Sequence, residues 1–169
     1  MDINILTNKP IPISMLRNPL HLLSLGFGSG LSPYAPGTMG TLVAIPLYLL
    51  LSRLELIAYL MVIVSGFILG IYLCHYTSKA LGVHDHSGIV WDEFIGYWIT
   101  MIAVPALTWQ WILAGFVLFR FFDIVKPWPV KLADKRVPGG FGIMIDDVLA
   151  GLYAFACIQI FWVYVADKL

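Results

Sequence analysis

Four acids stand in pairs at the beginning of apolar stretches of this sequence. Asp92 and Glu93 occur in VHDHSGIVWDEFIGYWIT, residues 83–100, and Asp146 and Asp147 occur in GIMIDDVLAG. Carboxylates beside hydrocarbon are costly to keep ionised, so they need a cation, a basic partner or water. Magnesium binds through one or two protein carboxylates together with substrate phosphate, and both pairs favour this chemistry. The simpler alternative is that the acids complement a helix start, with one of the second pair acting as an N-cap.

A third charged group is FRFFDIVKPWP, in which Arg120, Asp123 and Lys126 follow one another at three-residue spacing. This spacing puts neighbours on the same broad face of a helix. Arg120 and Lys126 suit phosphate, and Asp123 suits a metal ion or an arginine. A local ladder of ion pairs at a membrane boundary is the alternative. Charges inside an apolar membrane segment are expensive, however, and this favours a functional role.

Two loops carry weaker signals. Asp85 lies between His84 and His86, and it could orient a water molecule or receive a proton. Two histidines at this spacing can chelate a transition metal, but beside acids that suit magnesium we interpret them as surface loop residues. The second loop is GFGSGLSPYAPGTMGT, residues 26–41, where Gly37 and Thr38 open an apolar helix whose free N–H groups could meet an anion. Packing alone explains such glycines equally well.

The elements that must hold these residues are strongly apolar. Hydrophobic residues make up 60% of the 169-residue chain and charged residues 12%, against roughly 25% charged in soluble domains, which indicates a membrane protein. Ten basic and ten acidic residues cancel, so charge gives no reason to expect a nucleic-acid partner. Cys74 and Cys157 have neither zinc-site nor disulfide spacing. No linker divides the chain, so we expect one domain over residues 1–169, with residues 1–19 as an N-terminal arm and no secretory signal.

Five segments have the composition of membrane helices: Thr38–Leu51, Leu56–Cys74, Trp91–Val104, Trp109–Val125 and Val148–Ala166. The second is uncharged and about 28 Å long, enough to cross the hydrocarbon core. The fourth should end near Lys126, because two prolines follow. The first and third are too short to cross comfortably alone, so they could be tilted, re-entrant or short spans in a thinned bilayer. The fold class we predict is a small, all-α, multi-helix integral membrane protein.

Basic residues set the expected orientation of these segments. If the five segments cross alternately, one side holds eight basic residues and the other holds two, Arg53 and Lys168. The eight are Lys9, Arg17, Lys79, Arg120, Lys126, Lys131, Lys135 and Arg136. By the positive-inside rule the first side is cytoplasmic. The acids described above fall on the same side, although they were not used to derive it, so we predict a polar site that faces the cytoplasm.

Four of these motifs also carry a resemblance. The stretches GFGSGLSPYAPGTMGT, GVHDHSGIVWDEFIGYWIT, FRFFDIVKPWPV and GGFGIMIDDVLAG resemble, in order and spacing, the phosphatidylglycerophosphatase A family, over Leu20 to about Tyr153. The resemblance implies an all-helical, magnesium-dependent lipid phosphatase of the bacterial inner membrane, which converts phosphatidylglycerophosphate into phosphatidylglycerol. The residues that fall in matching motifs are Asp92, Glu93, Asp123, Lys126, Asp146 and Asp147.

Missing motifs narrow the expected mechanism. The sequence has no Cys-x5-Arg phosphate loop and no Asp-x-Asp-x-Thr motif, which leaves metal-assisted attack by water. The predicted catalytic residues are Asp85, Glu93 and Asp147, the predicted substrate-binding residues are Ser29, Thr38, Arg120 and Lys126, and the predicted metal ligands are Asp92, Asp123 and Asp146.

The alternative functions are a transporter with a cytoplasm-side acidic cluster and a non-catalytic scaffold for anionic lipids. A headgroup transferase is a third, but the acid pattern expected of CDP-alcohol transferases is absent.

Overall fold

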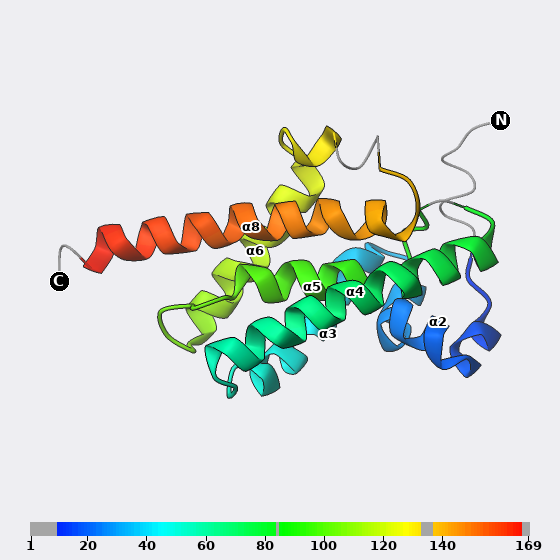
Figure 1. The fold of residues 1–169 in the computed structure, drawn as a ribbon, viewed down its shortest axis with the longest axis horizontal. Coiled ribbons are helices and arrows are strands. Elements are labelled where there is room, and N and C mark those ends of the chain that lie inside the picture. The colour runs from blue at the N-terminus through cyan, green and yellow to red at the C-terminus, as the bar shows by residue number, and fades with distance from the viewer. Residues whose placement is uncertain (1–9, 84, 133–136, 167–169) are drawn as a thin grey trace.

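Helices form all the regular structure in the part of the chain that the computed structural model describes, residues 10–83, 85–132 and 137–166. The elements, in order, are η1 (Ile13–Arg17), α2 (Pro19–Ser24), η2 (Gly26–Leu31), α3 (Pro36–Leu51), α4 (Leu56–Leu81), α5 (Trp91–Thr100), α6 (Trp109–Val125) and α8 (Gly139–Ala166). The predicted all-α class is therefore confirmed (Figure 1).

Helix ends differ from the prediction in three places. Helix α4 continues to Leu81 and ends at Gly82, whose φ of 72° suits a residue without a side chain. Helix α5 ends at Thr100 rather than at Val104, shortly before Pro105. Helix α8 begins at Gly139 instead of residue 148. Asp146 and Asp147 therefore lie inside a helix, and the suggestion that one of them is an N-cap is wrong.

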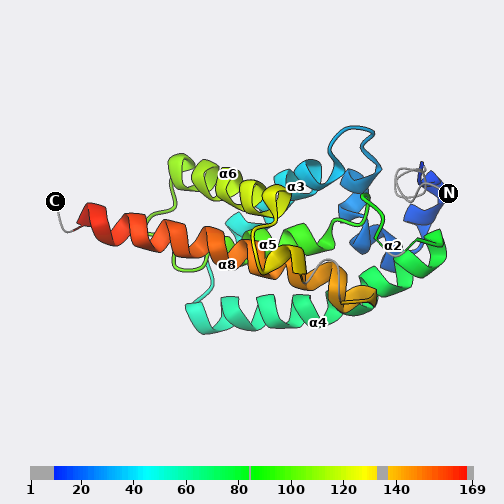
Figure 2. The ribbon, with the colours of Figure 1, turned by 90° about the horizontal axis from the view of Figure 1, so that it is seen from above.

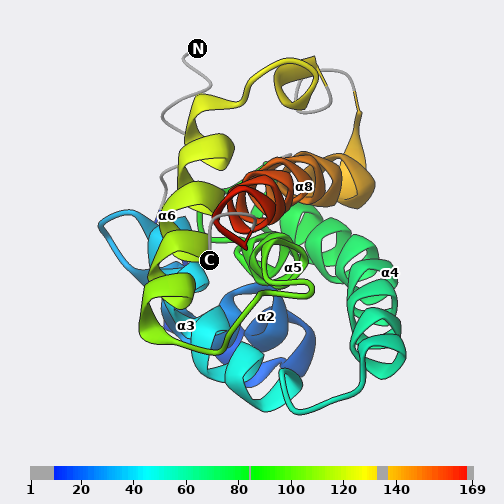
Figure 3. The same ribbon diagram turned by 90° about the vertical axis from the view of Figure 1, so that its left-hand side faces the viewer.

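Helix α5 lies at the centre of the bundle. Seen end-on, it is surrounded by α8, α4, α3 and α6, and all ten of its residues are buried (Figure 3). The indole N–H of Trp91 donates to the carbonyl of Gly66 at 3.0 Å, and that of Trp98 donates to the carbonyl of Ala44 at 3.2 Å. These bonds satisfy two donors that burial would otherwise leave unpaired. At ten residues, about 15 Å, α5 is too short to cross a bilayer.

Successive long helices run in alternating directions, so their ends collect at the two poles of the bundle. The beginnings of α3, α5 and α8 and the ends of α4 and α6 lie towards the pole where α2 is found (Figures 1 and 2). Each acidic or basic motif sits near one of these helix ends. Residues separated by more than a hundred positions in the sequence, such as Gly37 and Asp147, therefore reach the same pocket.

The outer surface of the bundle is apolar. Two helical stretches of the described chain, Leu56–Leu81 and Gly139–Tyr164, are long and apolar enough to cross a membrane. The core helix of a soluble protein can pass the same test, but such a helix is mostly buried, whereas only 22% of the apolar window of α4 is buried. Helix α6 adds an outward stripe at three- and four-residue spacing, made of Trp109, Leu113, Val117, Phe121 and Ile124. Surfaces of this kind suit lipid.

Candidate active site

A polar cavity opens where the charged motifs meet. Its volume is about 250 Å³, and α3, the loop before α5, α5 itself, α6 and α8 all contribute to its walls. Eight of the ten predicted site residues line it: Asp85, Asp92, Glu93, Arg120, Asp123, Lys126, Asp146 and Asp147. The sequence therefore predicted most of a single pocket from four separate stretches of chain. We call this cavity the acid pocket.

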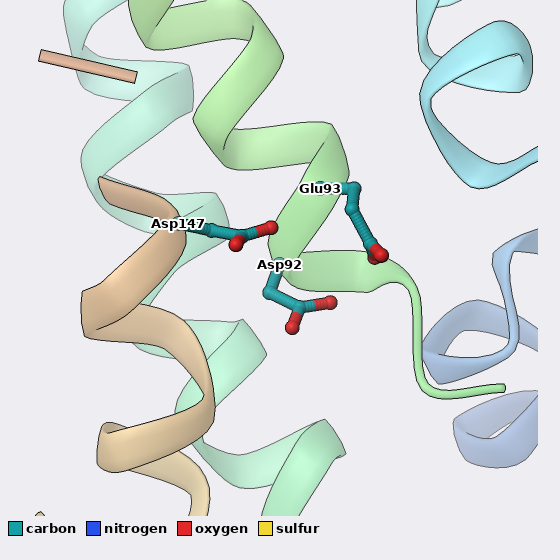
Figure 4. Close-up of side chains that lie close together, drawn as sticks. All are labelled: Asp92, Glu93 and Asp147. Carbon is teal, nitrogen blue, oxygen red and sulfur yellow. The ribbon is translucent and has the colours of Figure 1, made fainter. Parts of the chain in front are cut away.

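Three buried carboxylates form its innermost part. Asp92 and Glu93 project from the start of α5 and Asp147 from α8, and one oxygen of each lies within 4.8 Å of the other two (Figure 4). One oxygen atom of each group, namely Oδ1 of Asp92, Oε2 of Glu93 and Oδ2 of Asp147, accepts no hydrogen bond from the described residues. Burial, followed by the charge of neighbouring carboxylates, raises the pKa of Asp92 and of Glu93 well above their ordinary values. This cluster needs positive charge to be stable in its ionised form.

The donor set of the cluster fits a magnesium ion. Magnesium prefers hard oxygen ligands, and the three acids supply carboxylate oxygens with no sulfur or imidazole among them. Buried carboxylate oxygens without a hydrogen-bond donor are the positions at which a cation would compensate for lost hydration. The predicted metal ligands Asp123 and Asp146 are not part of this closest group, so that part of the assignment stays a prediction.

Asp123 and Asp146 instead lie against the two basic residues of the pocket. Arg120 Nη1 is 2.6 Å from Asp123 Oδ2 and 3.7 Å from Glu93 Oε1, and Lys126 Nζ is 2.6 Å from Asp146 Oδ2. The i,i+3 spacing along α6 explains the first pair. Because Lys126 has a left-handed backbone, φ 45°, it ends α6 where the sequence predicted. Both cations are thus held at the pocket wall, within reach of an anion.

A close contact between α5 and α8 sets the separation of the acids. A Cβ atom placed on Gly151 would collide with the carbonyl oxygen of Gly96, and one placed on Gly96 would lie 2.8 Å from the carbonyl oxygen of Asp147. Each glycine stands one helical turn after an acid of the cluster, Gly96 after Asp92 and Gly151 after Asp147. Glycine at both positions therefore lets the two helices approach closely enough for their carboxylates to meet.

The glycine-rich motif contributes to the pocket in a different way from the prediction. Ser29 donates its hydroxyl to the carbonyl of Gly26 at 2.8 Å, and neither Ser29 nor Thr38 lines the acid pocket. Gly37 does line it, and a Cβ there would collide with the Glu93 carboxylate and lie 3.1 Å from the Arg120 guanidinium. Gly37 was expected at the start of this helix, but it was not among the predicted substrate-binding residues. The substrate-binding roles of Ser29 and Thr38 stay predictions.

The loop before α5 places its polar residues unequally. Asp85 is exposed at the rim of the acid pocket, where contact with a water molecule is possible. His86 is buried, and its Nδ1 accepts the backbone N–H of Gly88 at 3.0 Å, so it helps to shape the loop. The interpretation of His86 as a surface residue is wrong for this reason. His84 lies outside the described residues.

Fold and pocket together define a class of protein: a small, apolar helical bundle with a carboxylate cluster and two bases in one pocket, arranged to meet a phosphate group. The phosphatidylglycerophosphatase A family model matches residues 22–162. The chain belongs to the phosphatidylglycerophosphatase A family, as its motifs suggested. It is therefore a lipid phosphatase.

Three relatives span nearly the whole chain. The chain is 57% identical over 147 residues to phosphatidylglycerophosphatase A of Escherichia coli (strain K12), covering 86% of each chain. It is 54% identical over 148 residues to the protein of that name from Haemophilus influenzae, covering 87% of this chain and 91% of the relative. A protein of Bacteroides thetaiotaomicron named putative phosphatidylinositol-3-phosphatase is 44% identical over 146 residues, with coverages of 82% and 91%. No solved structure matches the chain.

Replacement of Gly151 by alanine should displace the acids of the inner cluster, although the new methyl group does not contact their carboxylates. The new methyl group meets backbone rather than a flexible side chain, so α8 has to move away from α5. Misplacement of a reacting group by about 1 Å can lower turnover by about a hundredfold. The measurement is phosphate release per folded molecule. Gly66→Ala is the matched control, because its methyl group would meet the movable end of the Ile95 side chain. Equal losses in both variants would contradict a specific role for the α5–α8 contact.

Proposed function

We propose that this chain hydrolyses the terminal phosphate ester of phosphatidylglycerophosphate, producing phosphatidylglycerol and inorganic phosphate. Two observations together support the proposal. The relative from Escherichia coli bears this activity in its name, and the predicted acids and bases share one pocket. In the reaction, the oxygen of a water molecule bonds to phosphorus while the bond from phosphorus to the glycerol oxygen breaks, and the glycerol oxygen takes a proton from solvent to become a hydroxyl group.

The proposal divides the pocket into three tasks. Asp92, Glu93 and Asp147 would hold a magnesium ion, which when bound would draw charge from the phosphate oxygens and make water a better nucleophile. Arg120 and Lys126 bind the phosphate oxygens and balance the negative charge that develops during the reaction. Asp85 takes up the proton of the attacking water, since it is exposed at the rim.

In this scheme the two remaining acids position the bases. Asp123 orients the Arg120 guanidinium, and Asp146 fixes the Lys126 ammonium group. The sequence-based alternative, in which Asp123 and Asp146 bind the metal ion, predicts different effects of Asp146→Asn and Asp147→Asn on turnover and on its magnesium dependence.

The simplest test is phosphate release from purified protein in detergent micelles that contain phosphatidylglycerophosphate. Phosphatidylinositol 3-phosphate is the comparison substrate, because one relative carries that substrate in its name. We expect faster turnover of phosphatidylglycerophosphate. Absence of phosphate release from both lipids would overturn the proposed function, and preference for the inositol lipid would replace the substrate.

A transporter remains the clearest alternative from another class. Relay acids of a transporter belong near the middle of the membrane, between broken helices. The carboxylates here share one pocket with two bases, which suits a phosphate group rather than a cation or proton relay. Uptake into vesicles in the absence of phosphate release would favour the transporter.

We also propose that the chain crosses the bacterial inner membrane several times, with the acid pocket facing the cytoplasm. The apolar outer surface and the eight-to-two distribution of basic residues support this arrangement. The two ends of α4 would then lie on opposite sides of the membrane.

Labelling of single cysteines tests this topology. In a variant without Cys74 and Cys157, a cysteine replacing Ser87 should react with an impermeant reagent only from the cytoplasmic side. A cysteine replacing Ser52 should react only from the far side. Labelling of both cysteines from the same side of intact cells would contradict the orientation.

A further inference from the structure

A second cavity adjoins the acid pocket. Its volume is about 650 Å³, and it shares three lining residues with the acid pocket, namely Ala35, Pro36 and Ser87. The rest of its wall comes from the chain before and within η1, from the end of η2 and the residues after it, and from the loop before α5. We call it the side cavity. The reaction as described above makes no use of it.

Close packing fixes the shape of the side cavity. A Cβ atom on Gly88 would collide with the Ile11 side chain and lie 2.6 Å from the carbonyl oxygen of Gly30. Three segments of the chain therefore meet at Gly88, where the backbone of Gly30 and the side chain of Ile11 lie against it. These contacts hold the segments around the side cavity in place, so its shape is fixed.

The chemistry of the side cavity differs from that of the acid pocket. The acid pocket has six carboxylic acids in its wall, and the side cavity has none. Its lining is largely proline and aliphatic side chains, joined by Ser32, Ser87 and His86. Nδ1 of His86 accepts the backbone N–H of Gly88, which fixes this part of the wall. A lining of this kind suits an alcohol or a phosphodiester attached to hydrocarbon.

The proposed substrate is too large for the acid pocket alone. Its cleaved phosphate is joined through a glycerol unit to a second phosphate, and that phosphate is joined to the diacylglycerol. The inner phosphate is an anion to which no metal ion would be bound. Six acids around a cavity of about 250 Å³ would repel it, so the acid pocket has no favourable place for it. The side cavity is the adjoining space of larger volume, and Ile13, which is 75% exposed, lies in its wall. Tyr34, 82% exposed, follows the lining residue Pro33.

We infer that the side cavity is the subsite for the alcohol part of the substrate, holding the glycerol unit and the inner phosphodiester while the cleaved phosphate occupies the acid pocket. The inference rests on the proposed function. The subsite selects among phospholipids by the shape of the alcohol that carries the phosphate. The exposed apolar residues Ile13 and Tyr34 lie where the diacylglycerol leaves the protein towards lipid.

The test introduces a negative charge at the mouth of the side cavity. Ile13→Asp places a carboxylate beside the inner phosphodiester at an exposed position, where it does not disturb the core. We expect the KM for phosphatidylglycerophosphate in micelles to rise about tenfold or more through charge repulsion, with kcat unchanged. The inhibition constant of inorganic phosphate, which reports on the acid pocket alone, should stay the same. Leu107→Asp is the matched control, since Leu107 is a 54% exposed loop residue at the opposite pole.

A second variant fills the side cavity instead of charging it. Leu31→Trp adds volume to its wall and should raise the same KM, again without changing inhibition by phosphate. An unchanged KM in both variants would overturn the inference, as would an equal rise in Leu107→Asp. A parallel change in the phosphate inhibition constant would also overturn it, because the two cavities would then not be separate subsites. Absence of any phosphate release from the wild-type protein would refute the proposed function instead.

Discussion

Asp147→Asn should lower phosphate release by about a hundredfold or more while the protein stays folded, a barrier increase of at least ~2.7 kcal/mol. Asp147 is the one acid of the inner cluster that α8 supplies, and its carboxylate faces those of Asp92 and Glu93. Asparagine keeps the size of the side chain but removes a charge from the proposed cation site. The measurement is turnover per folded molecule at several magnesium concentrations. We expect Asp92→Asn to behave in the same way.

Asp146→Asn is the matched control, because it changes the neighbouring residue of the same helix. Asp146 lies 2.6 Å from Lys126 Nζ, so its loss should weaken substrate capture and leave the magnesium dependence of turnover nearly unchanged. The sequence-based assignment expects the opposite ranking, with Asp146 as ligand and Asp147 as a milder contributor. A large shift in the magnesium requirement of Asp146→Asn, with near wild-type behaviour of Asp147→Asn, would support that assignment and refute ours.

Removal of divalent cations should abolish activity altogether. Excess EDTA takes the proposed ion from the cluster, and magnesium should restore turnover without any need for zinc, since the cluster contains only oxygen ligands. Full activity in EDTA would contradict a metal-dependent reaction.

A second readout of the same experiment does not depend on activity. An ion that binds the folded state alone stabilises it by about 2.7 kcal/mol at a hundred times its dissociation constant. Magnesium should therefore raise the melting temperature of the wild-type protein in EDTA-treated samples. The shift should be lost in Asp147→Asn and kept in Leu107→Asp. Equal shifts in all three proteins would show that magnesium acts elsewhere.

Much of the fold follows from patterns within single segments. The end of α6 at Lys126 was predictable because Pro127 and Pro129 cannot continue a helix. The beginning of α8 was not, since GGFGI has the composition of a loop. Gly140 packs so closely on α4 that a Cβ there would collide with the carbonyl oxygen of Ile71. Contact between helices thus outweighs the low helix propensity of glycine, and a single segment does not reveal it.

The membership of the pocket was predictable, but the partners within it were not. Charge types and alternating helix directions bring Asp92, Asp123 and Asp147 into the same pocket. Which carboxylates touch depends on how each helix is rotated, and helix spacing alone does not give this rotation. Helix α5 is buried on every side, so no polar face indicates which neighbour its acids meet. The side cavity was missed because it is built from short turns before residue 37 that lack a regular apolar period.

The close approach of Gly96 and Gly151 has a consequence for protein engineering. A mutant library aimed at new lipid substrates would ordinarily leave the charged residues alone and vary their uncharged neighbours. Gly96 and Gly151 would be varied in such a library, although a side chain at either position meets backbone or an aromatic ring of the next helix. Many inactive clones would then report on helix spacing rather than on substrate choice. Keeping both glycine codons fixed, and varying the chain around residues 10–13 and 31–33, would direct the search to positions that can change without separating the acids.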